Sequence, residues 1–119
     1  MATRMTRITT HVLDIARGKP AGGMLVHLER RESPGEWRLL LSARTDGDGR
    51  CNKLEAEDGE GWAAGLYRLS LDTAGYFARH ELETLYPIVQ ITFLVREGQA
   101  HYHIPLLLSP HGYTTYRGS

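Results

Sequence analysis

The chain has 119 residues, 41% of them hydrophobic, and its 14 basic residues balance 14 acidic ones at a formal net charge of +0. This length suits a single domain with one core, and the neutral balance argues against nucleic acid or an anionic membrane surface as a partner. The longest apolar run, Leu106–Leu108, is far too short to cross a bilayer.

Cysteine usage and the start of the chain bear on its location. Cys51 is the only cysteine, so no internal disulfide can form, whereas small secreted domains usually contain several. The first residues include no apolar segment typical of a signal peptide. We therefore expect a reduced, cytoplasmic protein.

Alternating and β-branched segments predict a series of short strands. The expected strands are residues 7–14, 24–30, 37–44, 50–54, 65–72, 88–96 and 100–108. The Asp-Gly-Asp-Gly turn at 46–49 predicts that 50–54 returns along 37–44 as a hairpin. Residues 74–83 are expected to be helical, with Thr73 as the capping residue. Seven or eight strands with one short helix predict an all-β sandwich, a single domain over residues 7–119 that follows a disordered lead of residues 1–6.

The last expected strand and the residues after it carry the densest set of reactive groups. His101 and His103 point to one side of this strand and its apolar side chains point to the other. Two histidines at this spacing can hold a metal or transfer protons as a pair. A polar outer face of a half-exposed strand explains them equally well, and the spacing leaves both interpretations open.

Other candidate groups have simpler explanations. His11 and Arg50, taken alone, are typical of a structural strand histidine and of a solvated charge. The turn at 46–49 begins like a calcium loop, but Arg50 stands where a third acidic ligand belongs. Cys51 has no partner cysteine for zinc or redox chemistry. The sequence also contains no nucleophile elbow and no phosphate-binding glycine loop.

Three motifs in fixed order carry a family resemblance over about residues 7–119. They are His11-Val-Leu-Asp14 with Gly18-Lys-Pro-Ala21 and Leu25-Val26, then Tyr102-His-Ile-Pro-Leu-Leu-Leu-Ser-Pro-His-Gly-Tyr-Thr114, then Tyr116-Arg-Gly-Ser119. Together they resemble the transthyretin family. The resemblance implies a transthyretin-like Greek-key β-sandwich.

The family has two functional classes, and three features of this chain distinguish them. The hormone-carrier class typically has lysine at the position of His11 and threonine at that of His103, and it lacks the Tyr-Arg-Gly-Ser ending. This chain has both histidines and the ending. The resemblance therefore implies the hydrolase class, which opens the six-membered ring of 5-hydroxyisourate to 2-oxo-4-hydroxy-4-carboxy-5-ureidoimidazoline.

The resemblance also implies roles for particular residues. His11 and His103 would activate water and return a proton to the leaving nitrogen, and Arg50 would stabilise the oxyanion. Tyr116, Arg117 and Ser119 would bind the substrate. No cofactor or metal is implied, and the assembly would be a homotetramer, a dimer of dimers, with its pockets between dimers.

Two alternatives from other functional classes stay open. In the first, a zinc-dependent hydrolase uses His11, His101 and His103 as ligands, since three imidazoles with an open water position form a legitimate zinc site. In the second, the protein is a small-molecule carrier without catalytic activity.

Overall fold

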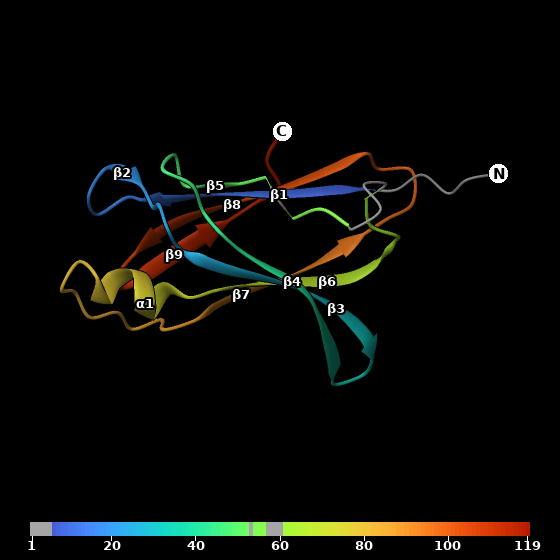
Figure 1. Cartoon of the computed structure of the whole chain (residues 1–119), viewed down its shortest axis with the longest axis horizontal. Helices are drawn as coiled ribbons and strands as arrows, with labels where there is room; N and C mark the ends of the chain where they lie inside the picture. The colour runs from blue at the N-terminus through green and yellow to red at the C-terminus, as the bar shows by residue number, and fades with distance from the viewer. Residues whose placement is uncertain (1–5, 53, 57–60) are drawn as a thin grey trace.

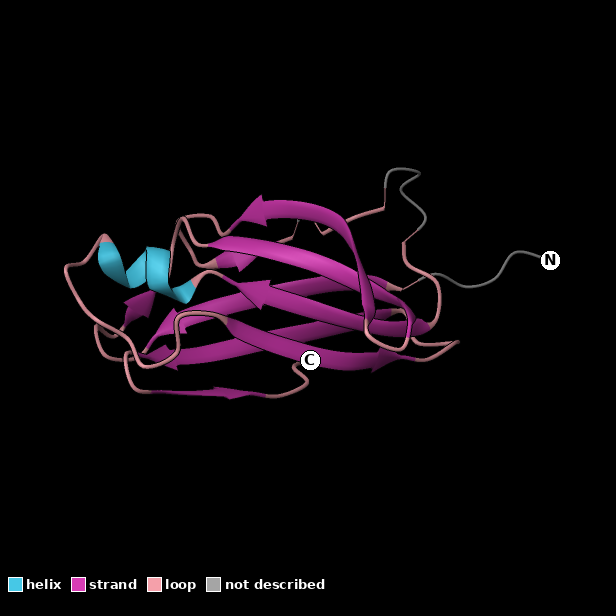
Figure 2. Ribbon diagram, turned by 90° about the horizontal axis from the view of Figure 1, so that it is seen from below, coloured by secondary structure: helices cyan, strands magenta, loops and turns pink. Residues whose placement is uncertain are grey.

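The computed structural model describes residues 6–52, 54–56 and 61–119, which form two packed β-sheets with one short helix (Figures 1 and 2). The strands are β1 (Arg7–Asp14), β2 (Lys19–Pro20), β3 (Leu25–Ser33), β4 (Glu36–Arg44), β5 (Arg50–Cys51), β6 (Gly65–Leu71), β7 (Val89–Val95), β8 (His101–Ser109) and β9 (Gly112–Thr115). The helix is α1 (Thr73–Ala78). The predicted all-β sandwich with one short helix is confirmed.

The first sheet places the two ends of the chain side by side. Its order is β2-β1-β8-β9, and β5 also pairs with β1. Strand β1 runs parallel to β8 over its whole length, from Arg7 opposite His101 to Asp14 opposite Leu108. Because β8 occupies one edge of β1, the two-residue strands β2 and β5 share the other edge. The second sheet is antiparallel throughout, in the order β4-β3-β6-β7.

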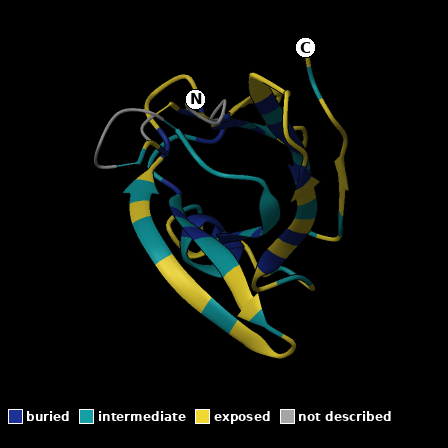
Figure 3. Cartoon of the chain, turned by 90° about the vertical axis from the view of Figure 1, so that its right-hand side faces the viewer, coloured by how far each residue is buried: buried dark blue, intermediate teal, exposed yellow. Residues whose placement is uncertain are grey.

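Alternation along the strands decides which side chains enter the core. Val26 and Leu28 of β3, with Met24 just before it, are buried. Viewed from one end, the molecule shows buried and exposed positions alternating along its strands (Figure 3). Each fully buried aliphatic side chain contributes roughly 1.5–3 kcal/mol from the hydrophobic effect. The outward positions of each strand are therefore free to carry chemistry.

Helix α1 closes one end of the sandwich (Figure 1). Tyr76 packs its ring inside and donates its hydroxyl hydrogen to the fully buried carboxylate of Asp14 at 2.7 Å. Burial raises the pKa of Tyr76, and the hydrogen bond to Asp14 raises it further. This contact fixes the C-terminal end of β1 against the helix.

The structure corrects two predictions about the helix. Asp72, not Thr73, is the N-cap residue, and its carboxylate accepts from the backbone N–H of Gly75. Thr73 is buried and donates to the carbonyl of Tyr86 instead. The helix ends at Ala78 rather than at residue 83, because Glu81 adopts a left-handed φ of 58° and the chain turns there.

The predicted hairpin at 46–49 is also wrong in its partner. The turn forms, with the N–H of Gly49 donating to the carbonyl of Asp46 at 2.9 Å. The chain then crosses to the other sheet, where β5 pairs with β1 and not with β4. The carbonyl of Gly49 already accepts from Val12 at 2.7 Å, so the turn itself is anchored to β1. The described strand ends at Cys51, and Lys53 lies outside the described residues.

Two further differences concern the ends of the chain. Residues 1–5 of the expected disordered lead lie outside the described residues, whereas Thr6 is buried and pairs with Trp62. Strand β9 was not predicted, because three of its four side chains are exposed and give no apolar alternation. None of the helices in the described part of the chain has the length and apolar character needed to span a bilayer.

Candidate active site

The outer face of the first sheet gathers the candidate groups. On β1, Thr9 and His11 point outward because Ile8, Thr10 and Val12 fill the core. On β8, His101 and His103 point outward for the same reason. The parallel register sets Thr9 opposite His103, and β5 sets Arg50 opposite His11. Residues more than 90 positions apart in sequence thus become neighbours.

All of these groups except His11 line a pocket of about 280 Å³. It is lined by Arg7, Thr9, Arg50, Asn52, His101, His103 and Ser119. None of these lining residues is acidic, and two are arginines whose charge is permanent. The pocket therefore offers hydrogen-bond donors and positive charge to a ligand that is rich in oxygen.

His103 is half-buried at the base of this pocket. Burial is the largest cause of its lowered pKa, followed by the positive charges of His101, Arg50 and His11. A lowered pKa keeps the imidazole neutral at neutral pH, so one ring nitrogen can accept a proton. His103 is thus suited to act as a general base.

His11 lies beside the pocket, close enough for its charge to lower the pKa of His103. Its Nε2 lies 2.9 Å from the backbone carbonyl of Asp48. A carbonyl can only accept, so Nε2 carries the hydrogen in this contact and Nδ1 is the basic nitrogen of neutral His11. Asp48 belongs to the turn at 46–49, where the carboxylate of Asp46 accepts from the N–H groups of Asp48 and Arg50 at 2.9 and 3.0 Å. The turn therefore positions His11 and Arg50 together.

The last two residues of the chain, Gly118 and Ser119 (the tail), lie against His103. The N–H of Gly118 donates to the carbonyl of His103 at 2.7 Å, and this bridge brings Ser119 to the pocket. A Cβ at Gly118 would lie 2.6 Å from Cδ2 of His103 and 3.1 Å from Cγ of Pro105. Only glycine fits here without displacing either the tail or the ring.

Tyr116 and Arg117 lie elsewhere in this chain. Both line an adjacent apolar hollow of about 180 Å³, together with Tyr102. The guanidinium of Arg117 stacks 4.1 Å from the centre of the Tyr102 ring and donates to the carbonyl of His101 at 3.1 Å. Of the six predicted site residues, the pocket collects Arg50, His103 and Ser119, with His11 at its side.

Three lining residues were not singled out from the sequence: Thr9, Arg7 and Asn52. Thr9 is the most informative of them, since its hydroxyl lies 2.8 Å from Nδ1 of His103 and 2.8 Å from Nε2 of His101. Its importance depends on the register between β1 and β8, which neither strand reveals by itself.

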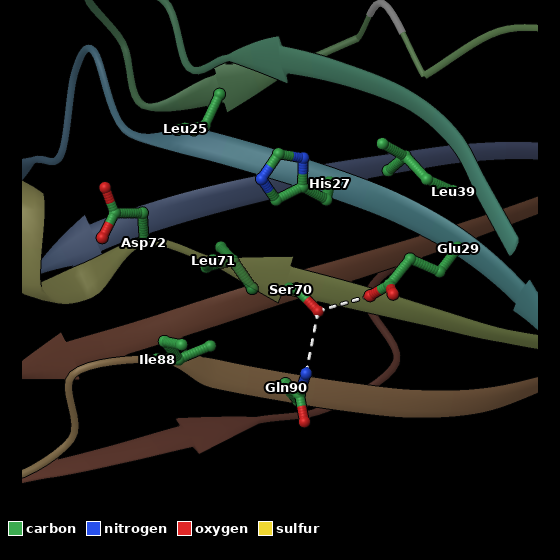
Figure 4. A pocket seen from close by; sticks show the side chains of 9 residues that line it. All are labelled: Leu25, His27, Glu29, Leu39, Ser70, Leu71, Asp72, Ile88 and Gln90. Carbon is green, nitrogen blue, oxygen red and sulfur yellow. Dashed lines mark hydrogen bonds between the residues drawn. The ribbon is translucent and has the colours of Figure 1, made fainter. Parts of the chain in front are cut away.

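A larger pocket, of about 410 Å³, lies on the outer face of the second sheet (Figure 4). Its one glutamate, Glu29, accepts two hydrogen bonds from Arg68 at 2.8 and 3.1 Å and one from Ser70 at 2.6 Å. Hydrogen bonding to Arg68 is the main reason that the pKa of Glu29 is lowered. Gln90 donates in turn to Ser70 (Figure 4). The other two lining side chains with titratable groups also have partners: Asp72 accepts from the backbone N–H of Gly75, and His27 hydrogen-bonds to Ser42. The polar groups here are therefore engaged in structural contacts, so this pocket is a weaker candidate for chemistry.

The geometry also bears on the zinc alternative. Within the described residues, no three His, Cys, Asp or Glu side chains lie close enough together to hold one metal ion. His11, His101 and His103 therefore do not form a ligand set in this structure, because Nε2 of His101 and Nδ1 of His103 both point at the Thr9 hydroxyl.

Comparison with known proteins gives a consistent result. The model of the HIUase/Transthyretin family matches residues 8–118. The 5-hydroxyisourate hydrolase of Mus musculus is 42% identical over 120 residues, covering 100% of both chains. The structure of Klebsiella pneumoniae 5-hydroxyisourate hydrolase has a TM-score of 0.84 and 36% identity, covering 97% of this chain and 100% of that one. Transthyretin from Sparus aurata has a TM-score of 0.86 but 29% identity, covering 94% of this chain and 96% of that one. The two kinds of relative are equally similar in fold, and the hydrolases are more similar in sequence.

Proposed function

The chain belongs to the HIUase/transthyretin family, and from this premise we propose that it hydrolyses 5-hydroxyisourate in urate catabolism, with His11, Arg50 and His103 as catalytic residues. The observation that carries the proposal is the convergence of both histidines and the arginine on one face of one sheet. Relatives with 42% identity over essentially the whole chain are 5-hydroxyisourate hydrolases.

The reaction needs an activated water molecule, stabilisation of the oxyanion and a proton for the departing nitrogen. In our proposal His103 takes a proton from water as the water oxygen bonds to the ring carbonyl carbon. The C–N bond then breaks, and the nitrogen receives a proton from the histidine pair. Because burial keeps His103 neutral, it is available as the base. His11 holds the water through Nδ1, since its Nε2 is committed to Asp48.

Arg50 would stabilise the oxyanion, the second requirement of the reaction. Its side chain lines the pocket, and its backbone is fixed by the 46–49 turn. A permanent planar cation aimed at the attacked carbonyl stabilises the negative charge that develops on oxygen. Arg7 adds positive charge on the same side. Ser119 would hydrogen-bond the flat heterocycle.

We further propose that the protein is a homotetramer, a dimer of dimers, in which Tyr116 and Arg117 help to complete a site through a neighbouring subunit. In the single chain both residues lie in the hollow beside the pocket and not in it. The pocket is also small and open to the surface, and a second subunit would enclose the substrate. Light scattering after size exclusion should give four times the mass of one chain. A fully active monomer would contradict this part of the proposal.

The activity itself can be tested directly. Urate oxidase generates 5-hydroxyisourate in the cuvette, and its ultraviolet absorbance decays spontaneously. Purified protein should accelerate that decay in proportion to its concentration, and a chelator should not abolish the effect. Decay at the spontaneous rate, with tight binding of the substrate, would favour the carrier alternative. Loss of activity with chelator and its recovery with zinc would favour the metal alternative. The cytoplasmic location stays a prediction.

A further inference from the structure

We infer that Thr9 and His101 are positioning residues that fix which ring nitrogen of His103 carries its hydrogen. The inference rests on the proposed function, because it concerns the group we propose as the base. It assigns a role to His101, which the family resemblance did not include, and to Thr9, which the sequence did not single out.

The geometry is a chain of three side chains on the outer face of the first sheet. The Thr9 hydroxyl lies 2.8 Å from Nδ1 of His103 on one side and 2.8 Å from Nε2 of His101 on the other. Thr9 is only 7% exposed, so water cannot easily replace either contact. The two imidazole centres are 6.2 Å apart, as expected for rings that share one hydroxyl between them.

A hydroxyl has one hydrogen to donate and two lone pairs that accept, so a Thr9 hydroxyl that donates to one of the two rings allows two arrangements. A third, in which Thr9 accepts from both rings, leaves its own hydrogen without a partner among the contacts described for it. In the first, Thr9 donates to His101 and accepts from Nδ1–H of His103, which leaves Nε2 of His103 as the basic nitrogen. In the second, Thr9 donates to Nδ1 of His103, and Nε2 then carries the hydrogen. Of the two arrangements in which Thr9 donates to a ring, only the first lets neutral His103 take a proton from water through Nε2.

Both arrangements leave Nε2 of His103 for water, because Thr9 occupies Nδ1 and the tail at Gly118 lies against Cδ2 of the ring. The role of His103 as a base therefore requires the first arrangement, in which Nε2 has no hydrogen. Burial, followed by the positive charges of His101, Arg50 and His11, lowers the pKa of His103 and favours its neutral imidazole. Neutral His101 can accept at Nε2, which is what the first arrangement requires.

The test combines nitrogen-15 NMR of the histidine rings with steady-state kinetics on the full chain. The signals of His103 are assigned by their loss in His103→Gln. Wild-type His103 should show the tautomer with hydrogen on Nδ1 at pH 7.5. Thr9→Val removes the hydroxyl at nearly constant volume and should shift His103 toward the other tautomer. The kcat should fall about 10-fold to 100-fold, with KM little changed.

Conservative variants serve as the rescue. Thr9→Ser keeps the hydroxyl and should keep both the tautomer and kcat. His101→Gln keeps an acceptor for Thr9 and should retain most activity, whereas His101→Leu removes it and should lower kcat. Thr92→Val and His27→Gln, on exposed or half-buried positions of the second sheet, control for the substitutions themselves.

The outcomes separate this inference from the proposed function. If wild-type His103 carries its hydrogen on Nε2, or if Thr9→Val changes neither tautomer nor kcat, the inference is overturned. A changed tautomer with unchanged kcat overturns its part in catalysis. If Thr9→Val fails to fold, the wild-type spectrum and the comparison of His101→Gln with His101→Leu still test the inference. A wild-type protein with the expected tautomer but no effect on 5-hydroxyisourate would refute the proposed function while leaving the tautomer assignment intact.

Discussion

The two outer faces of the sandwich carry pockets of opposite character. On the second sheet, the larger pocket contains two carboxylates: Arg68 and Ser70 hydrogen-bond to Glu29, and the backbone of Gly75 donates to Asp72. On the first sheet, the described residues that line the smaller pocket include two arginines and two histidines and no aspartate or glutamate. On the second sheet, Arg68 forms an ion pair with Glu29, whereas no ion pair of Arg7 or Arg50 occurs among the described residues. Positive charge, rather than volume, distinguishes the face on which we propose the chemistry.

The strongest test of this comparison exchanges one histidine on each face. His103→Gln should lower kcat by about 10²-fold to 10⁴-fold, since glutamine cannot transfer a proton. His27→Gln on the second sheet should leave the rate unchanged, because the partners described for His27, Ser42 and Glu29, also lie on the second sheet. Rates of 5-hydroxyisourate decay for the two variants check the prediction. Equal rates would remove the distinction between the faces.

Substitutions of Arg50 and Arg68, one on each face, should separate an effect on activity from an effect on stability. Arg50→Gln is expected to lower kcat about 10²-fold to 10³-fold with little change in stability, because the lost interaction is with the oxyanion. Arg68→Met should leave kcat intact and lower the free energy of unfolding by about 1–3 kcal/mol, since Glu29 and Trp37 lose a charged partner. Urea unfolding and kinetics on both variants give the result. A stability loss in Arg50→Gln that matches its activity loss would contradict the assignment.

A smaller effect is expected from one methyl group near the tail. Gly118→Ala places a Cβ against the ring of His103 and should lower kcat about 10-fold to 100-fold through misplacement of the ring or of Ser119. Gly112→Ala is the matched control, since its Cβ would meet only the Ser109 hydroxyl at 3.7 Å. Both variants should unfold at nearly the wild-type temperature. Comparable rates for the pair would show that the tail does not position the site.

The smallest expected effect is a pH dependence of stability. The folded protein holds the pKa of His103 below its ordinary value of about 6.5. On acidification, the unfolded chain therefore takes up this proton first, so stability falls as the pH drops through 6.5 toward the folded pKa. His103→Gln should flatten that part of the curve, measured as the free energy of unfolding between pH 8 and 5. His27→Gln, on the other face, tests whether the slope belongs to His103.

Much of the fold could be predicted because alternation reports burial directly. Strand β1 was predicted with its observed bounds, and β3 was predicted at residues 24–30 and found at Leu25–Ser33. The partner of β5 could not be predicted, because a tight turn fixes the reversal of the chain but not the sheet that receives it. Strand β9 has exposed side chains and so gives no burial signal. At the helix, Asp72 and Thr73 are both good capping residues, and only packing decides between them.

The candidate site was predicted less completely, for a physical reason. His11 and His103 were assigned to one site only through the family resemblance, because the sequence of neither strand predicts that the two histidines lie close together. Thr9 gained its place only from the parallel register, in which it lies opposite His103. The roles of Tyr116 and Arg117 could not be located in one chain, because both lie in the adjacent hollow.

The parallel union of β1 and β8 has a consequence for how activity arises during biosynthesis. The hydroxyl-to-imidazole contact spans 94 positions of sequence, so nearly the whole polypeptide must leave the ribosome before the reactive face exists. Contacts of such range form slowly and late in folding. A nascent or partly folded molecule would be inert, and catalytic turnover would report the completed molecule.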